Sequence, residues 1–139
     1  MQMRDYPLVD TRKVVNNAMN ILIVEDNRLM REMIRETVSE FADLVTECED
    51  GDEAFAAYQA NLPHWVLMDI QMPRVDGFTA SCEIRSSYPN ANICIVTDYG
   101  DARTRALARE VGATAFVLKE NLDDLRTMLG HWIQPHTHN

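Results

Sequence analysis

Long hydrophobic runs are absent from the 139-residue sequence, in which no apolar stretch approaches the roughly 20 residues of a membrane-spanning helix. The first residues, MQMRDYPLVDTRKVVNNAMN, also lack the contiguous apolar core of a secretory signal. Cysteine is scarce, and Cys48, Cys82 and Cys94 show neither paired nor metal-like spacing. We interpret these cysteines as reduced and mostly buried, which favours an intracellular, cytoplasmic protein.

Positive charge is in short supply, because 13 Lys and Arg residues face 22 Asp and Glu residues. The net charge of −9 argues against nucleic acid or an anionic membrane as the main partner. The hydrophobic share of 46% is ordinary for a globular protein with a real core. A chain of this length is about one domain.

Internal repeats and low-complexity linkers are also missing, so the chain divides simply into an extension at 1–19, a domain at 20–130 and a tail at 131–139. Two interpretations of the extension stay open: a remnant upstream of a natural start at Met19, or a short helix around Asp10 to Ala18 that packs on the domain. The tail contains three histidines, for which a frayed terminus is favoured over a metal site: His131, His136 and His138.

Short apolar runs recur along the domain, and their length and continuity predict strands buried on both faces of a parallel sheet. The four strong runs are Ile21–Val24, Trp65–Met68, Ile93–Val96 and Ala115–Leu118. A fifth run, Leu44–Cys48, mixes polar with apolar residues and is typical of a sheet edge.

Helical patterns separate these runs, so the chain alternates five strands with five helices. Parallel strands require crossovers, and right-handed crossovers place helices on both faces, which predicts a doubly wound α/β fold. The expected helical segments are 27–41, a segment opened by an Asp50–Glu53 capping box, 76–87, 101–111 with Gly112 as C-cap, and a last helix capped by Asn121. In the first helix, Arg28, Arg31 and Arg35 are interpreted as a solvated face.

Polar side chains follow every strong strand, and the carboxyl ends of parallel strands share one edge where such folds bind ligands. We therefore expect five side chains to meet there: Glu25, Asp26, Asp69, Thr97 and Lys119. Two unit charges about 4 Å apart interact by roughly 1 to 4 kcal/mol, so three carboxylates repel more than one lysine can offset. Oxygen ligands without His or Cys favour Mg²⁺ or Mn²⁺, and such a metal prepares a site for a phosphoryl group.

Four motifs in these segments resemble the receiver domain of two-component response regulators: ILIVEDN, VLMDIQMPRVDG, IVTD and GATAFVLKE. The resemblance covers about Asn20 to Gly130 and implies a flavodoxin-like (βα)5 fold with strand order 2-1-3-4-5. It implies a signalling phosphoprotein with Mg²⁺-dependent self-phosphorylation and autodephosphorylation only, and not a classical enzyme. A flavin carrier fits poorly, since EDNRLM offers acids where a phosphate loop is needed.

The resemblance also implies a role for each acid and for the lysine. Asp69 would be the phosphoacceptor, and Asp26 would bind Mg²⁺ directly. Glu25 would act through water or share the metal, and the backbone carbonyl of Gln71 would be a further ligand. Lys119 would pair with Asp69 and then with a phosphoryl oxygen.

The same resemblance implies a switch and a set of partners. Thr97 would hydrogen-bond the attached phosphoryl group, and Phe116 matches the family's mobile aromatic residue. A histidine kinase or histidine phosphotransfer protein would be the donor. A downstream effector, or a second copy in a homodimer, would bind the face formed by 101–111, 115–118 and the last helix. The alternative is a receiver fragment of a longer DNA-binding or enzymatic regulator.

Two positions depart from the family pattern. Glu120 stands where proline often follows the lysine, and Asp98 stands where a small residue often follows the threonine. Asp98 would add negative charge at the mouth of the pocket and slow anionic phosphodonors.

Overall fold

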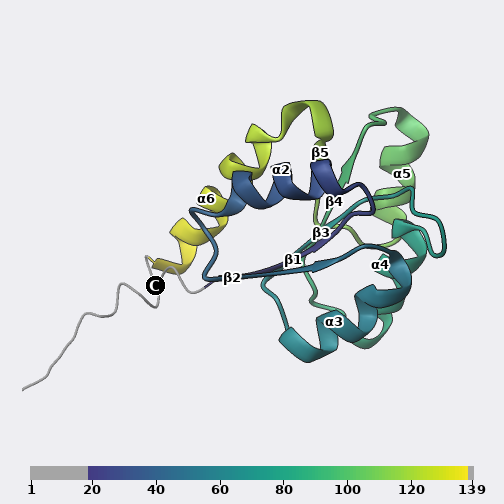
Figure 1. Cartoon of the computed structure of the whole chain (residues 1–139), viewed down its shortest axis with the longest axis horizontal. Coiled ribbons are helices and arrows are strands. Elements are labelled where there is room, and N and C mark those ends of the chain that lie inside the picture. Colours follow the sequence, from purple (N-terminus) through teal and green to yellow (C-terminus); the bar gives the residue numbers. More distant parts are fainter. Residues whose placement is uncertain (1–18, 138–139) are drawn as a thin grey trace, which may run out of the picture.

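The computed structural model describes residues 19–137, with side chains up to residue 133, and its centre is a parallel sheet of five strands. The spatial order is β2-β1-β3-β4-β5, which confirms the predicted doubly wound topology (Figure 1). The strands are β1 (Asn20–Val24), β2 (Leu44–Cys48), β3 (Trp65–Met68), β4 (Ile93–Thr97) and β5 (Ala115–Leu118).

Helices cover both faces of the sheet. They are α2 (Arg28–Val38), α3 (Ala54–Asn61), α4 (Gly77–Ser87), α5 (Ala102–Glu110) and α6 (Asp123–Thr137). Two short 3-10 turns, η1 (Gly51–Glu53) and η2 (Lys119–Asn121), precede α3 and α6. Figure 1 shows α2 and α6 above the sheet, with α3 and α4 below it. No helix in the 19–137 region is long and apolar enough to cross a membrane.

Each strand contributes to two hydrophobic cores because successive side chains point to opposite faces. Ile21, Ile23 and Leu67 pack on the side of α2 and α6. Leu22 and Met68 pack on the side of α3, α4 and α5. Both faces of the central strands are therefore dry, as their continuous apolar sequence predicts, and their polar residues are confined to the strand ends.

Side-chain caps fix where several helices begin. Asn27 Oδ1 accepts from Met30 N at 2.8 Å, and Asp76 Oδ1 accepts from Thr79 N at 2.8 Å. Gly112 follows α5 with φ of +87°, which confirms the expected left-handed cap.

Some predicted helix boundaries are wrong. The first helix ends at Val38 rather than Phe41. Asp50 does act as an N-cap, but of the 3-10 turn η1, which ends at Glu53, and α3 begins only at Ala54. The Asp50 carboxylate also accepts from the backbone of Arg74 and Val75. Asn121 closes η2 and does not cap α6.

The expectation of a frayed terminus after Gly130 is also wrong for residues 131–133. Helix α6 continues past Gly130, and Trp132 and Ile133 pack against the core beneath α2. The rings of Trp132 and Trp65 lie edge to face, with centroids 6.4 Å apart. His136 lies where side chains are not described. His138 and the suggested helix at Asp10–Ala18 lie outside the described residues.

Candidate functional site

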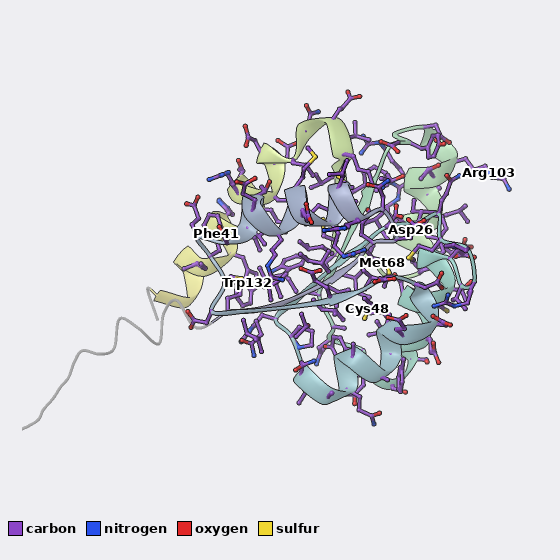
Figure 2. All side chains as sticks on the ribbon, in the orientation of Figure 1. Asp26, Phe41, Cys48, Met68, Arg103 and Trp132 are labelled. Atoms are coloured by element: carbon purple, nitrogen blue, oxygen red, sulfur yellow. The ribbon has the colours of Figure 1, made fainter. Side chains whose placement is uncertain are left out.

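A polar cleft of about 370 Å³ lies at the carboxyl ends of the central strands. All five predicted strand-end residues line it. The other lining residues are Asn27, Met30, Gln71, Asp98 and Tyr99. Parallel register explains the convergence, because Val24 pairs with Met68 and Thr97 pairs with Leu118 at the last step of each ladder. Figure 2 shows Asp26 at the opposite end of the sheet from Trp132.

Lys119 is the cation at the centre of the cleft. Its Nζ lies 2.9 Å from Asp69 Oδ1 and 3.0 Å from Glu25 Oε1. All three side chains are at least nine-tenths buried. One ammonium group therefore faces two buried carboxylates, which leaves a net negative charge that this part of the chain does not offset.

The three acids form a suitable set of metal ligands. Carboxylate oxygens of Glu25, Asp26 and Asp69 all lie within 4.8 Å of one another. Glu25 Oε2 accepts from Asn27 N at 3.1 Å, whereas the buried Oε1 has no hydrogen bond and faces Lys119 only as an ion pair. An all-oxygen ligand set matches hard cations such as Mg²⁺, so the residues present fit the metal that the sequence predicts.

Burial and neighbouring charges shift the pKa values of both Asp69 and Lys119. Burial, together with the charge of Glu25 and against the opposing effect of Lys119, raises the pKa of Asp69 to about 7. Burial works to lower the pKa of Lys119, but close contacts with Asp69 and Glu25 and their charges raise it above its ordinary value. The lysine is therefore held as a cation, while ionised Asp69 is costly without a further positive charge.

Residues 21–130 match the model of the response regulator receiver domain. The chain belongs to the response regulator receiver domain family.

Relatives of this receiver domain include both short and long proteins. It is 34% identical over 102 residues to a chemotaxis protein CheY from Halobacterium salinarum, covering 73% of this chain and 85% of that protein. It is 30% identical over 111 residues to the transcriptional regulatory protein DegU from Brevibacillus brevis, covering 78% of this chain but only 47% of DegU. The chain thus spans less than half of that longer relative.

Solved structures agree with this assignment. A CheX–CheY–BeF3–Mg²⁺ complex from Borrelia burgdorferi contains a chain with a TM-score of 0.68 and 26% identity, covering 72% of this chain and 77% of that one. Proteins of this family are signalling proteins, and they bind Mg²⁺ at an acidic pocket.

Thr97 and Phe116, the two predicted switch residues, occupy different places in the receiver domain. Thr97 is buried in the cleft, and its Oγ1 accepts from Tyr99 N at 3.2 Å. Phe116 is half-buried outside the cleft, with the Arg105 guanidinium 4.5 Å above its ring. The Phe116 ring therefore does not contact the acids in this conformation.

Residues that sequence reasoning missed support the acidic end of β1. The interpretation of the arginine stripe on α2 as a solvated face is wrong for Arg31, whose side chain is only 12% exposed. Its Nη1 donates to the backbone oxygen of Glu25 at 2.8 Å, and its Nε donates to Glu47 at 3.0 Å.

Of the cysteines, Cys48 and Cys94 are buried as predicted, while Cys82 is exposed, and all three are free.

The segment 70–76, after β3, depends on close backbone packing. Gly77 N donates to the Ile70 oxygen at 2.8 Å. A Cβ at Gly77 would lie 1.9 Å from the backbone oxygen of Asp69, so only glycine fits there. This packing fixes the strand end that carries Asp69 and leads directly to Gln71.

Proposed function

We propose that Asp69 accepts a phosphoryl group from a phosphohistidine on a histidine kinase or histidine phosphotransfer protein. The observation that carries this proposal is the setting of Asp69, a buried carboxylate 2.9 Å from Lys119 Nζ and beside two further acids at an open cleft. A carboxylate nucleophile needs a cationic partner for the incoming phosphoryl oxygens, and Lys119 is in place for that role.

The transfer forms an acyl phosphate. A carboxylate oxygen of Asp69 bonds to phosphorus while the bond between phosphorus and the donor's imidazole nitrogen breaks, and the electron pair stays on that nitrogen. Glu25, Asp26, Asp69 and the backbone carbonyl of Gln71 would hold Mg²⁺ or Mn²⁺, which supplies positive charge against the phosphoryl oxygens. The ion pair of Glu25 with Lys119 supports a water-mediated role for this acid.

Phosphorylation would then act as a switch. The Thr97 hydroxyl would leave the Tyr99 amide and donate to a phosphoryl oxygen, and the loop after β4 would move with it. The Phe116 ring would leave Arg105 and turn inward. The face formed by α5, β5 and α6 would change shape and bind an effector or a second copy of the chain.

A longer regulator is the second candidate context, because the receiver domain matches less than half of DegU. In that case the same face would contact a DNA-binding or enzymatic domain within one polypeptide, and the chemistry at Asp69 would be unchanged.

Intact-mass measurement after incubation with Mg²⁺ and acetyl phosphate tests the phosphoacceptor directly. We expect one acid-stable, base-labile phosphoryl adduct on the wild type and none on Asp69→Ala. EDTA should also prevent the adduct, because the acids then repel the donor without a metal.

An adduct that persists in Asp69→Ala would remove Asp69 from this role. Asp98 at the mouth of the cleft is expected to slow an anionic donor. Beryllofluoride binding is therefore measured in parallel, and failure of the wild type with both reagents contradicts the proposal.

A further inference from the structure

Asp50 is a buried carboxylate that the proposed phosphotransfer does not use. It follows β2 and is 1% exposed. Its oxygens accept three backbone N–H groups: Val75 N at 2.8 Å, Arg74 N at 3.0 Å and Asp52 N at 3.3 Å. Two of these donors belong to the loop 70–76, more than twenty residues away in sequence.

The neighbouring glycine brings the same two segments into direct contact. A Cβ at Gly51 would lie 2.3 Å from the backbone oxygen of Val75 and 3.2 Å from Ala80 Cβ. The backbone of Val75 cannot move aside as the end of a flexible side chain could. The Asp50 carboxylate therefore bonds the tip of loop 70–76, and the packing against Val75 leaves no room for a side chain at Gly51.

The base of the loop is fixed as well. Gly77 N closes it onto the Ile70 oxygen, and the close approach of Gly77 to Asp69 holds the strand end. Half-buried Ile70, Met72 and Val75 pack on the core. Gln71 lies between these anchors and lines the acidic cleft.

We propose that Asp50 and Gly51 are positioning residues for the metal site, holding loop 70–76 so that the Gln71 backbone carbonyl faces Asp26 and Asp69. This inference rests on the proposed function, because it assigns the loop a ligand for Mg²⁺. It assigns the Asp50–Gly51 turn more than a structural role: the turn sets metal affinity from the far side of the loop.

Asp50→Asn tests the role of the carboxylate. The asparagine amide directs its own N–H groups at the backbone donors of loop 70–76, so at least one of the bonds to Arg74 or Val75 is lost. We expect the Kd for Mg²⁺, measured by isothermal titration calorimetry on the unphosphorylated protein, to rise about 10- to 100-fold, the usual effect of removing a partner behind a metal ligand. The rate of adduct formation at saturating Mg²⁺ should fall less than the affinity does.

Two matched variants separate position from charge. Asp52→Asn removes one negative charge two residues away, and Asp52 bonds only the exposed guanidinium of Arg74 through its side chain. We expect its Kd to stay within about twofold of the wild type. Gly51→Ala changes no charge but pushes on the Val75 oxygen, so it should weaken Mg²⁺ binding as Asp50→Asn does, and it decides the matter if Asp50→Asn fails to fold.

A purely structural role predicts a different pattern. Lower urea midpoints for Asp50→Asn and Gly51→Ala, with the Mg²⁺ Kd within about twofold of the wild type, would overturn the inference. So would an equal loss of affinity in Asp52→Asn. Failure of the wild type itself to bind Mg²⁺ would instead contradict the proposed function.

Discussion

Asp69 faces two opposing demands within one side chain. A nucleophile for phosphorus must be ionised, yet burial raises the pKa of this carboxyl to about 7. The ordinary value for Asp is about 3.9, so between pH 4 and 7 the folded protein holds a proton that the unfolded chain has released. Ionised Asp69 therefore costs stability, and the cost grows as the pH rises through this window.

Asp69→Asn should for this reason stabilise the metal-free protein at neutral and higher pH. The amide keeps the shape of the carboxyl, and Lys119 keeps its ion pair with Glu25. We expect the free energy of unfolding at pH 8 to rise by about 1–2 kcal/mol, typical of removing a strained functional group. The gain should shrink as the pH falls from 7 toward 4, because the folded protein holds Asp69 neutral there and the proton binding of the two states converges only near the unfolded pKa of about 3.9.

Urea unfolding in EDTA across pH 4 to 8 measures this effect. Asp98→Asn is the matched control, since it removes one exposed carboxylate from the same cleft and should change stability by less than about 0.5 kcal/mol. A gain in Asp69→Asn that does not depend on pH would exclude ionisation of Asp69 as its cause.

At the scale of elements, helix α2 is joined to the edge strand β2 through two arginines, of which Arg31 is the more buried. Arg31 bridges the backbone oxygen of Glu25 and the Glu47 carboxylate, and Arg35 also pairs with Glu47. Arg28, one turn earlier, is 82% exposed and pairs only with Glu32 on its own helix. The two positions offer the same residue type in two environments.

Arg31→Ala should lower the free energy of unfolding by about 1–3 kcal/mol, because it removes a part-buried charge-assisted bond and leaves the backbone oxygen of Glu25 without its donor. Arg28→Ala should cost at most about 0.5 kcal/mol, the worth of an exposed helix pair. Chemical unfolding of the two variants under one condition measures the difference. Equal losses would place Arg31 among ordinary surface arginines.

The same contrast shows how far sequence predicts this protein. Strand ends were predictable because apolar runs stop abruptly at Asp69 or Lys119, and parallel topology then requires that they meet. Arg28 and Arg31 look alike on a helical wheel, since only the lateral pairing of β1 with β2 brings Glu47 beside α2. The local capping bond of Asp50 to Asp52 N is predictable from sequence, whereas its two other donors, Arg74 N and Val75 N, are more than twenty residues away.

Tertiary packing also explains the error at the C-terminus. The sequence HWIQPHTHN has histidine, proline and polar residues typical of a fraying end. The surface on which Trp132 lies is built from other segments, including Trp65 and His64. The local sequence pattern cannot show that such a surface exists. Packing against that surface supplies the free energy that extends α6.

At the scale of the whole molecule, the chain carries a net charge of −9, and one cleft brings three of its acids together. A cation that binds only the folded arrangement stabilises it by mass action, since the unfolded chain has no such cluster. Screening by any salt also relieves general repulsion among surface carboxylates. The two effects are separable because only the first depends on the identity of the ion and on the cleft.

Mg²⁺ should therefore raise the free energy of unfolding by about 2.7 kcal/mol at a concentration 100-fold above its Kd. NaCl at equal ionic strength should produce only the smaller, general gain, because Na⁺ lacks the charge to hold three carboxylates together. Asp26→Asn removes a ligand at the exposed side of the cluster and should reduce the Mg²⁺ effect to that of NaCl. Urea titrations at a fixed pH measure all three cases, and an equal gain from both salts would mean that the −9 charge, rather than an assembled metal site, responds to the cation.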